Sequence, residues 1–168
     1  MKNRGFTLIE LLVVIAVIGI LASVVMASLN SARVKARNAR RSSDVVQLRN
    51  AVNLAITDSG IFPPSGWACI SATCYGLWSQ YPADASVDAM LAPYISSKPI
   101  DPPGGRDGNG GYLYNGSWPG GPVYGGTKTV PAGPVLNFSA EMPLKADTCA
   151  PGYVIGVFGN AIDCIIYL

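Results

Sequence analysis

The chain has 168 residues, a hydrophobic content of 49%, a formal net charge of +2, four cysteines and no histidine. A charge this close to zero gives no bulk attraction for nucleic acid, and the length allows one modest globular domain. Without histidine the chain lacks the commonest general acid, general base and metal ligand, and no serine lies in a Gly-x-Ser-x-Gly elbow. We therefore expect a protein that is not an enzyme.

The N-terminal segment combines a short basic leader with a long uncharged run. Lys2 and Arg4 precede a single acid, Glu10, after which no charged residue occurs from Leu11 to Ala32. At about 1.5 Å per residue this run forms a helix of roughly 33 Å, which matches the hydrocarbon thickness of a bilayer. The run is longer than the apolar core of a secretory signal peptide, so we expect a retained membrane-spanning helix.

Glu10 lies at the edge of this apolar run, where a carboxylate is costly. An acidic side chain at the middle of a bilayer costs about 3 kcal/mol, and less near a helix end. Glu10 therefore either lies in the headgroup layer, favoured by the positive end of the helix dipole, or has a specific partner.

Residues 5–22, with the sequence GFTLIELLVVIAVIGILA, resemble the N-terminal signature of type IV pilins and type II secretion pseudopilins. The resemblance implies that a membrane peptidase cuts after Gly5 and that the new terminal amine, on Phe6, is methylated. Residues 1–5 would then be a leader. It also implies that Glu10 pairs with the terminal amine of a neighbouring subunit during filament assembly. An intramolecular pair is the alternative, because Phe6 and Glu10 are four residues apart on one helix face.

A basic stretch follows the apolar run. Five cations occur within nine residues: Arg33, Lys35, Arg37, Arg40 and Arg41. Such a stretch is typical of a solvated helix, and it also suits lipid headgroups or DNA. Five cations after the run and two before it favour, by the positive-inside rule, the opposite membrane orientation from the one that the resemblance implies. The cleavage signature is more specific than a charge count, so we follow the resemblance.

An amphipathic pattern continues the helix beyond the basic stretch. Apolar residues recur at intervals of three and four from residue 45 to residue 56, namely Val45, Leu48, Val52, Ala55 and Ile56. Gly60 is a C-cap candidate, and Pro63 and Pro64 cannot continue the helix. We predict one helix over residues 6–58, with a membrane-spanning part at about 6–32 and an amphipathic part at 33–58. The resemblance implies loosening near Gly19 in filaments, but no proline accompanies that glycine here.

Residues 59–168 predict a small, loop-rich β domain. Asp84 or Ser86 should cap a short helix that ends at Pro93. Residues 99–134 contain eighteen glycines and prolines in thirty-six positions, too many for a regular core. Strands are expected at 112–114 and 135–138, and a hairpin with a Gly159-Asn160 turn at 153–168. The predicted fold class is α+β and type IV pilin-like, with the long helix packed on a small antiparallel sheet.

Four cysteines in a domain outside the cytoplasm suggest two disulfides, for which three pairings are possible. We favour Cys69 with Cys74 and Cys149 with Cys164, the latter placing Cys164 opposite Ile155 across a two-residue turn. Zinc is disfavoured, because histidine is absent and the spacings fit zinc sites poorly.

Two further features concern ligands. The Pro-x-Asp-Pro turn at residues 99–102 resembles pseudopilins, some of which bind calcium in a loop, and Asp101, Asp107 and Asn109 are weak calcium candidates. No bidentate glutamate accompanies them, so we predict no cofactor. The three tryptophans are Trp67, Trp78 and Trp118. They form either a sugar-binding surface or, in the interpretation we prefer, a cover over a small hydrophobic core.

We interpret the chain as a structural subunit of a type IV pilus-like filament that serves adhesion, motility or DNA uptake. The first alternative, favoured by the Pro-x-Asp-Pro turn, is a pseudopilin of a type II secretion system. The second is a membrane-tethered binding domain that does not polymerise, against which Glu10 argues. The resemblance implies partners in further copies, a prepilin peptidase and methyltransferase, an inner-membrane assembly platform, minor pilins and membrane lipid. It implies a single-pass prepilin in the inner or cytoplasmic membrane, then a filament in the periplasm or at the cell surface.

Overall fold

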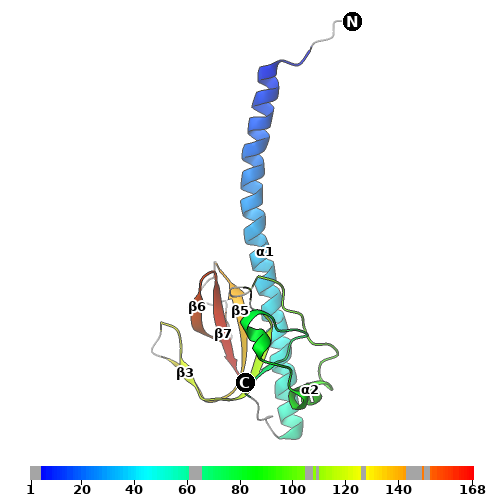
Figure 1. The fold of residues 1–168 in the computed structure, drawn as a ribbon, viewed down its shortest axis with the longest axis vertical. Coiled ribbons are helices and arrows are strands. Elements are labelled where there is room, and N and C mark those ends of the chain that lie inside the picture. Colours follow the sequence, from blue (N-terminus) through cyan, green and yellow to red (C-terminus); the bar gives the residue numbers. More distant parts are fainter. Residues whose placement is uncertain are drawn as a thin grey trace. The chain divides into compact units, whose positions relative to one another are not determined.

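The computed structural model describes residues 5–60, 66–104, 108, 110–125, 128–142, 149 and 152–168. The chain divides into two compact units, the first ending at Ala36 and the second beginning at Arg37. Helix α1, Leu8–Ser59, contributes its first half to one unit and its second half to the other (Figure 1). These 52 helical residues agree with the helix predicted over residues 6–58.

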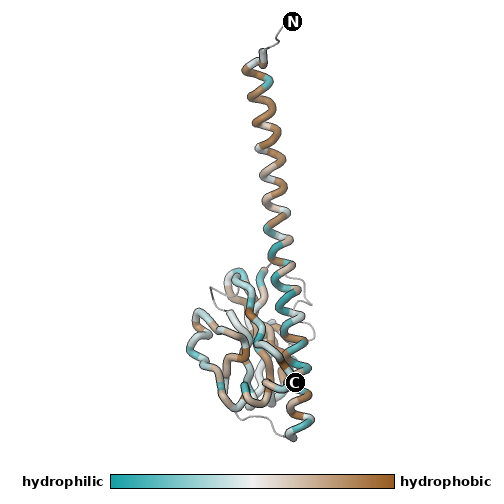
Figure 2. The backbone as a smooth tube through the Cα atoms, turned by 90° about the vertical axis from the view of Figure 1, so that its right-hand side faces the viewer, coloured by the Kyte–Doolittle hydropathy of each residue, from teal (hydrophilic) through white to brown (hydrophobic). Residues whose placement is uncertain are grey.

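The first unit is an isolated apolar helix. Every described residue up to Arg33 is exposed, and the tube of this part of the helix is mainly in the hydrophobic colour in Figure 2. The helix is long and apolar enough to cross a membrane, by length and composition. It passes through Gly19 without interruption, so no loosening occurs there in the single chain.

The second half of α1 packs through the face that the sequence predicts. Val45, Leu48, Val52 and Ala55 are all buried. The helix ends as expected, with Gly60 in the left-handed region at φ +69° and its amide donating to the Ile56 carbonyl at 2.7 Å.

A five-stranded antiparallel sheet lies against this half of the helix. Its strand order is β1-β2-β5-β7-β6, and β3 and β4 form a separate two-stranded sheet. The strands are β1 (Trp67–Cys69), β2 (Tyr112–Trp118), β3 (Gly121–Pro122), β4 (Thr129–Val130), β5 (Gly133–Glu141), β6 (Tyr153–Phe158) and β7 (Ala161–Tyr167). The fold is therefore α+β and pilin-like, as predicted.

The expectation that residues 99–134 contribute no regular core was wrong. Strand β2 lies wholly within this tract and pairs with β1 and β5 inside the sheet. Some of the glycines there stand at strand ends, as where Gly133 begins β5. Gly111, immediately before β2, has φ +119°, and a Cβ added to it would lie 2.5 Å from the Cys74 sulfur. Glycine is thus needed where the chain turns into β2, and β2 forms even though Gly116 lies inside it.

The C-terminal hairpin forms with the predicted turn, but one pairing differs from expectation. Phe158 pairs with Ala161, so the turn has two residues. Cys164 lies opposite Val154 and not opposite Ile155, because the register shifts by one residue between Val154 and Gly156. An extra residue in one strand is a β-bulge, which hydrophobic alternation alone does not reveal.

Two short helices accompany the sheet among the described residues of the second unit. Helix α2, Ala85–Leu91, begins at the predicted cap, where the Asp84 side chain accepts hydrogen bonds from the amides of Ser86 and Val87. A 3-10 helix, η1, spans Gly76–Gln80 and was not predicted.

The tryptophans pack as the preferred reading predicted. Trp78 is buried with Cys69 and Leu113 in a small cluster. Trp67 and Trp118 are partly buried, and their rings lie 5.4 Å apart between centroids. These side chains cover the core and do not form an open aromatic platform.

Candidate assembly site

The first turn of α1 is closed by a reciprocal pair of hydrogen bonds between Thr7 and Glu10. The Glu10 amide donates to Thr7 Oγ1 at 3.3 Å, and the Thr7 amide donates to Glu10 Oε2 at 2.9 Å. The Thr7 hydroxyl also donates to Oε2, at 2.7 Å. This is a capping box, in which Thr-x-x-Glu satisfies amides that the first turn would leave without partners.

The capping box uses one oxygen of the Glu10 carboxylate. Both bonds from Thr7 end on Oε2, so neither occupies Oε1. Phe6, which the resemblance implies would be the mature terminus, is 80% exposed, and a shallow apolar hollow is lined by Phe6, Ile9, Glu10, Val13 and Val14. The site can therefore hold a local cap and still accept a hydrogen bond from a further donor.

The exposed apolar surface around this carboxylate is large. Fifteen bulky apolar side chains between Leu8 and Leu29 are each at least 46% exposed. Those more than half exposed include Leu8, Ile9, Leu11, Leu12, Val13, Ile15, Ile18, Ile20, Leu21 and Met26. Full burial of one such side chain is worth about 1.5–3 kcal/mol. A helix with this surface is stable only in lipid or against other apolar helices.

A second cluster of charges, buried in the second unit, was not predicted. Arg41 is 0% exposed, and its guanidinium donates to Asp101 Oδ1 at 2.7 Å and to Glu141 Oε1 at 2.8 Å. Arg37 donates twice to the Glu141 carboxylate, through Nε at 2.7 Å and through Nη2 at 2.5 Å. Asn38 bonds to both backbone groups of Glu141. The cluster thus joins α1 to the end of β5 and to the loop at residue 101.

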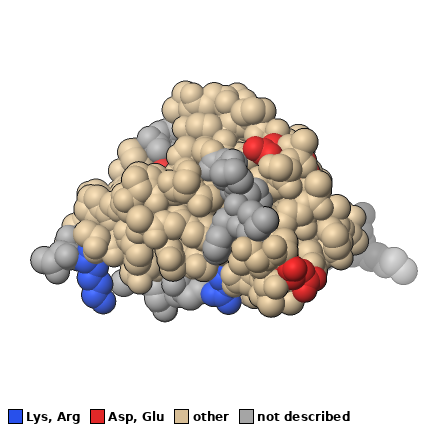
Figure 3. All heavy atoms as spheres, turned by 90° about the horizontal axis from the view of Figure 1, so that it is seen from below, with Lys and Arg blue, Asp and Glu red and all other residues tan. Residues whose placement is uncertain are grey.

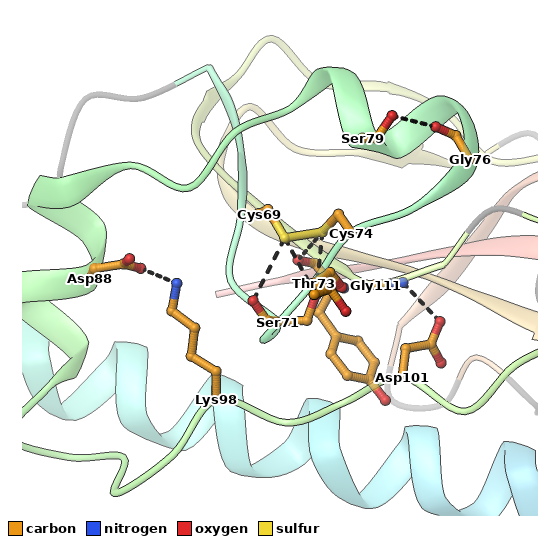
Figure 4. The surroundings of a disulfide bond; sticks show 11 residues. Cys69, Ser71, Thr73, Cys74, Gly76, Ser79, Asp88, Lys98, Asp101 and Gly111 are labelled. Atoms are coloured by element: carbon orange, nitrogen blue, oxygen red, sulfur yellow. Dashed lines mark hydrogen bonds and ion pairs between the residues drawn. A yellow bond between two sulfur atoms is a disulfide. The ribbon is translucent and has the colours of Figure 1, made fainter.

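The chain around the cluster is shaped to fit it. Gly104 has φ +111°, and a Cβ added there would lie 2.8 Å from Glu141 Cδ. The second oxygen of Asp101 accepts a hydrogen bond from the Gly111 amide at 2.8 Å, beside the Cys69–Cys74 disulfide (Figure 4). The first disulfide and the buried ion pairs therefore fix neighbouring parts of one loop region.

The cluster shifts the acidity of its members in opposite directions. Burial raises the pKa of Asp101, although the Arg41 charge and the Gly111 amide oppose that rise. Burial acts in the same way on Glu141, but hydrogen bonds from Arg37 and Arg41 outweigh it and hold the pKa of Glu141 below its ordinary value. The bonds to Glu141 also raise the pKa of Arg37, so both arginines remain charged.

Asp101, one of the calcium candidates, is buried, and its two oxygens accept hydrogen bonds from Arg41 and from the Gly111 amide. Asp107 and Asn109 lie outside the described residues. Among the residues that the structure describes, no three acidic, cysteine or histidine side chains are placed to share a metal ion.

The four cysteines form two disulfides, Cys69–Cys74 and Cys149–Cys164. Their Cα atoms are 6.0 and 5.3 Å apart, within the usual range for a disulfide. The second bridge ties residue 149 to the middle of β7.

The sequence did contain a signal for the buried arginine. Arg41 precedes Val45 by four residues and Leu48 by seven, so it continues the buried stripe of the helix. Its partners are 60 and 100 residues further along the chain, and no local pattern identifies them.

Residues 1–26 match the family described as the prokaryotic N-terminal methylation motif. This match confirms the resemblance of the N-terminal segment to the signature of type IV pilins and type II secretion pseudopilins. The relatives include the type II secretion system core protein G of Escherichia coli (strain K12), 44% identical over 62 residues. The corresponding proteins of Vibrio cholerae serotype O1 and Aeromonas hydrophila are 39% and 40% identical over 62 residues.

These matches cover 37% of this chain and 42–43% of the three relatives, so the chain matches less than half of each relative's length. No solved structure matches the chain significantly.

Proposed function

We propose that the chain is a pseudopilin, a non-enzymatic structural subunit that assembles through its N-terminal helix into a filament of a type II secretion system. The observation that carries the proposal is the fully exposed apolar half of α1, which holds one carboxylate at its start. Such a surface needs either lipid or other copies of the same helix. A filament subunit uses both in turn, first as a membrane protein and then as part of a helical core.

The relatives favour the secretion pseudopilus over the surface pilus that the sequence first suggested. All three are named as core proteins of type II secretion systems. The methylation motif itself, matched at residues 1–26, does not separate the two kinds of filament. Within the described part of the globular domain, Trp67, Trp78 and Trp118 pack in the core or at its edge and give no support to an adhesive surface.

The proposed assembly step uses the free side of the Glu10 carboxylate. After cleavage behind Gly5, the terminal amine of Phe6 carries a positive charge, and Oε1 of a neighbouring Glu10 accepts its hydrogen bond. Thr7 continues to hold Oε2. An unpaired charge among packed apolar helices costs several kcal/mol. The ion pair between Glu10 and the terminal amine of the neighbouring subunit therefore favours the one register of the two helices in which these groups meet.

The proposed partners follow from the same step. They are further copies of the chain, a prepilin peptidase that also methylates Phe6, an inner-membrane assembly platform and minor pilins. The subunit would start as a single-pass protein in the inner membrane, with its β domain outside the cytoplasm, where the two disulfides form.

The test compares Glu10→Gln with Asp58→Asn, an acid-to-amide change at an exposed position of the same helix. Sheared material from producing cells is examined by electron microscopy, and the N-terminus is identified by mass spectrometry. We expect methylated Phe6 in the unaltered chain, filaments from it and from Asp58→Asn, and none from Glu10→Gln. A chain that is cut but stays monomeric with either residue at position 10 would support the tethered binding domain instead.

A second test separates secretion from pilus function. In the native host, deletion of the gene should stop the release of secreted enzymes and leave twitching and DNA uptake unchanged. Loss of motility with normal secretion would favour the type IV pilus.

A further inference from the structure

The structure divides the basic stretch into two groups that the sequence presents as one. Arg37 and Arg41 are neutralised by Glu141 and Asp101, and Arg40 lies 3.9 Å from Asp44. Arg33 and Lys35 belong to the first unit, are exposed, and form no ion pair with any residue that the structure describes. Two cations therefore remain uncompensated directly after the apolar part of α1.

These two side chains do not share one face of the helix. At 3.6 residues per turn, positions two apart project about 200° from each other around the axis. A single protein surface would meet one of them and leave the other outside the contact. A layer of lipid headgroups surrounds a helix on all sides and can meet both.

Their depth also suits a headgroup layer. The uncharged run ends at Ala32, one residue before Arg33, so a helix that places residues 11–32 in hydrocarbon brings both cations to the phosphate level. Long basic side chains at a helix end extend readily to that level. By contrast, charged groups are scattered among uncharged ones on the face of the molecule seen in Figure 3.

We infer that Arg33 and Lys35 form a binding site for the phosphate groups of anionic phospholipids in the leaflet on the side of the β domain. The inference rests on the membrane anchoring in the proposed function. The site would hold the subunit at a fixed depth before assembly. It would also make extraction from an anionic membrane harder than extraction from a neutral one.

The test uses the full chain reconstituted in phosphatidylcholine vesicles that contain about one fifth phosphatidylglycerol. Spin-labelled phosphatidylglycerol and spin-labelled phosphatidylcholine report which lipid is immobilised at the protein. The variant combines Arg33→Gln with Lys35→Gln. The control combines Arg49→Gln with Lys128→Gln, which removes the same charge at positions outside the first unit. Lys2 and Arg4 contribute equally in every sample.

We expect a preference for phosphatidylglycerol that the control retains and the variant largely loses, on a scale of about fivefold for each cation at low salt. Added sodium chloride should weaken the preference by screening. Inorganic phosphate at equal ionic strength should weaken it no further. If phosphate competes more strongly than chloride, the site binds a free anion, and the lipid assignment is wrong.

Other outcomes also overturn the inference. Equal selectivity in the variant and the unaltered chain would mean that the two cations are simply solvated. Chemical cross-linking of the same vesicles reports contacts between copies of the chain. If the variant keeps its lipid selectivity but loses these cross-links, Arg33 and Lys35 belong to a subunit interface. Failure of the chain to float with the vesicles would instead contradict the membrane anchoring of the proposed function, which keeps the two failures distinct.

Discussion

The chain contains two glutamates, and they show how differently its two units use charge. Glu10 is exposed on an apolar helix, and the hydrogen bonds that we describe for it come from Thr7, three residues away. Glu141 is 6% exposed and is held by Arg37 and Arg41, about 100 residues away in sequence. One carboxylate keeps an oxygen open for another molecule, while the other is enclosed by its own chain. The first unit thus exposes its acidic group together with an apolar surface, whereas the second unit pairs Glu141 within its own chain.

This comparison predicts that equivalent substitutions will have unequal effects on the free energy of unfolding of the second unit. The largest effect is expected for Arg41→Met, which leaves the Asp101 carboxylate buried without its cation. Breaking a buried pair from one side costs about 3–5 kcal/mol. Arg40→Met is the matched control and should cost less than about 1 kcal/mol, because that side chain is 60% exposed and its pair is long.

Urea unfolding of the full chain in detergent, followed by tryptophan fluorescence, measures both variants. Equal losses for the two arginines would mean that the buried cluster contributes no more than a surface pair. The contrast between the enclosed and the open unit would then fail.

The next effect concerns the disulfides, both of which lie in the second unit. The double variant Cys149→Ala with Cys164→Ala removes a disulfide between cysteines 15 residues apart in sequence. Loop-closure entropy predicts that it lowers the free energy of unfolding by about 3 kcal/mol. Opening the separation of 5 between Cys69 and Cys74 should cost about 2 kcal/mol. Thermal unfolding of both double variants tests this order, and a reversed order would mean that the Cys69–Cys74 region depends on its bridge for more than chain entropy.

A pH dependence should separate the two carboxylates of the buried cluster. The pKa of Glu141 is lower in the folded chain, so its stabilising contribution is present above the ordinary carboxyl pKa and is lost as the pH falls through the lowered value. The pKa of Asp101 is raised, so its contribution has the opposite sign: it is present below the ordinary carboxyl pKa and is lost as the pH rises through the raised value. Glu141→Gln should flatten the acid-side decline, and Asp101→Asn should steepen it. Urea titrations at several values from about pH 2.5 to about pH 7 test both signs, and parallel curves for the two variants would contradict them.

The smallest effect compares the two capped helices. Asp84→Ala removes the cap of α2 and should lower the free energy of unfolding of the second unit by about 1 kcal/mol. Thr7→Ala removes the capping box of α1 and should leave that free energy unchanged, because Thr7 belongs to the first unit. An effect of Thr7→Ala on the unfolding of the β domain would show that the two units are coupled.

Much of the fold was predictable because its signals are local. The cap at Asp84, the end of α1 at Gly60 and the turn before Ala161 each depend on a few adjacent residues. The glycine-rich tract misled the prediction because composition does not distinguish a glycine inside a strand from one such as Gly111 at its start. The bulge near Ile155 was missed because β6 has the sequence YVIGVF, in which no polar residue marks one face and alternation therefore does not fix the register.

The sequence by itself determined the first unit, because the length of an apolar run, a Thr-x-x-Glu cap and a cleavage signature all act within a few helical turns. It also determined which face of the second half of α1 is buried, through the spacing of Val45, Leu48 and Val52. Only the tertiary structure decided that Arg41 is enclosed and that Arg33 is left open. A charge is neutralised by whatever carboxylate the fold brings within about 3 Å, and here those carboxylates come from β5 and from the loop at residue 101. The energy of such a pair depends on distance and burial, which are properties of the folded chain and not of neighbouring letters in the sequence.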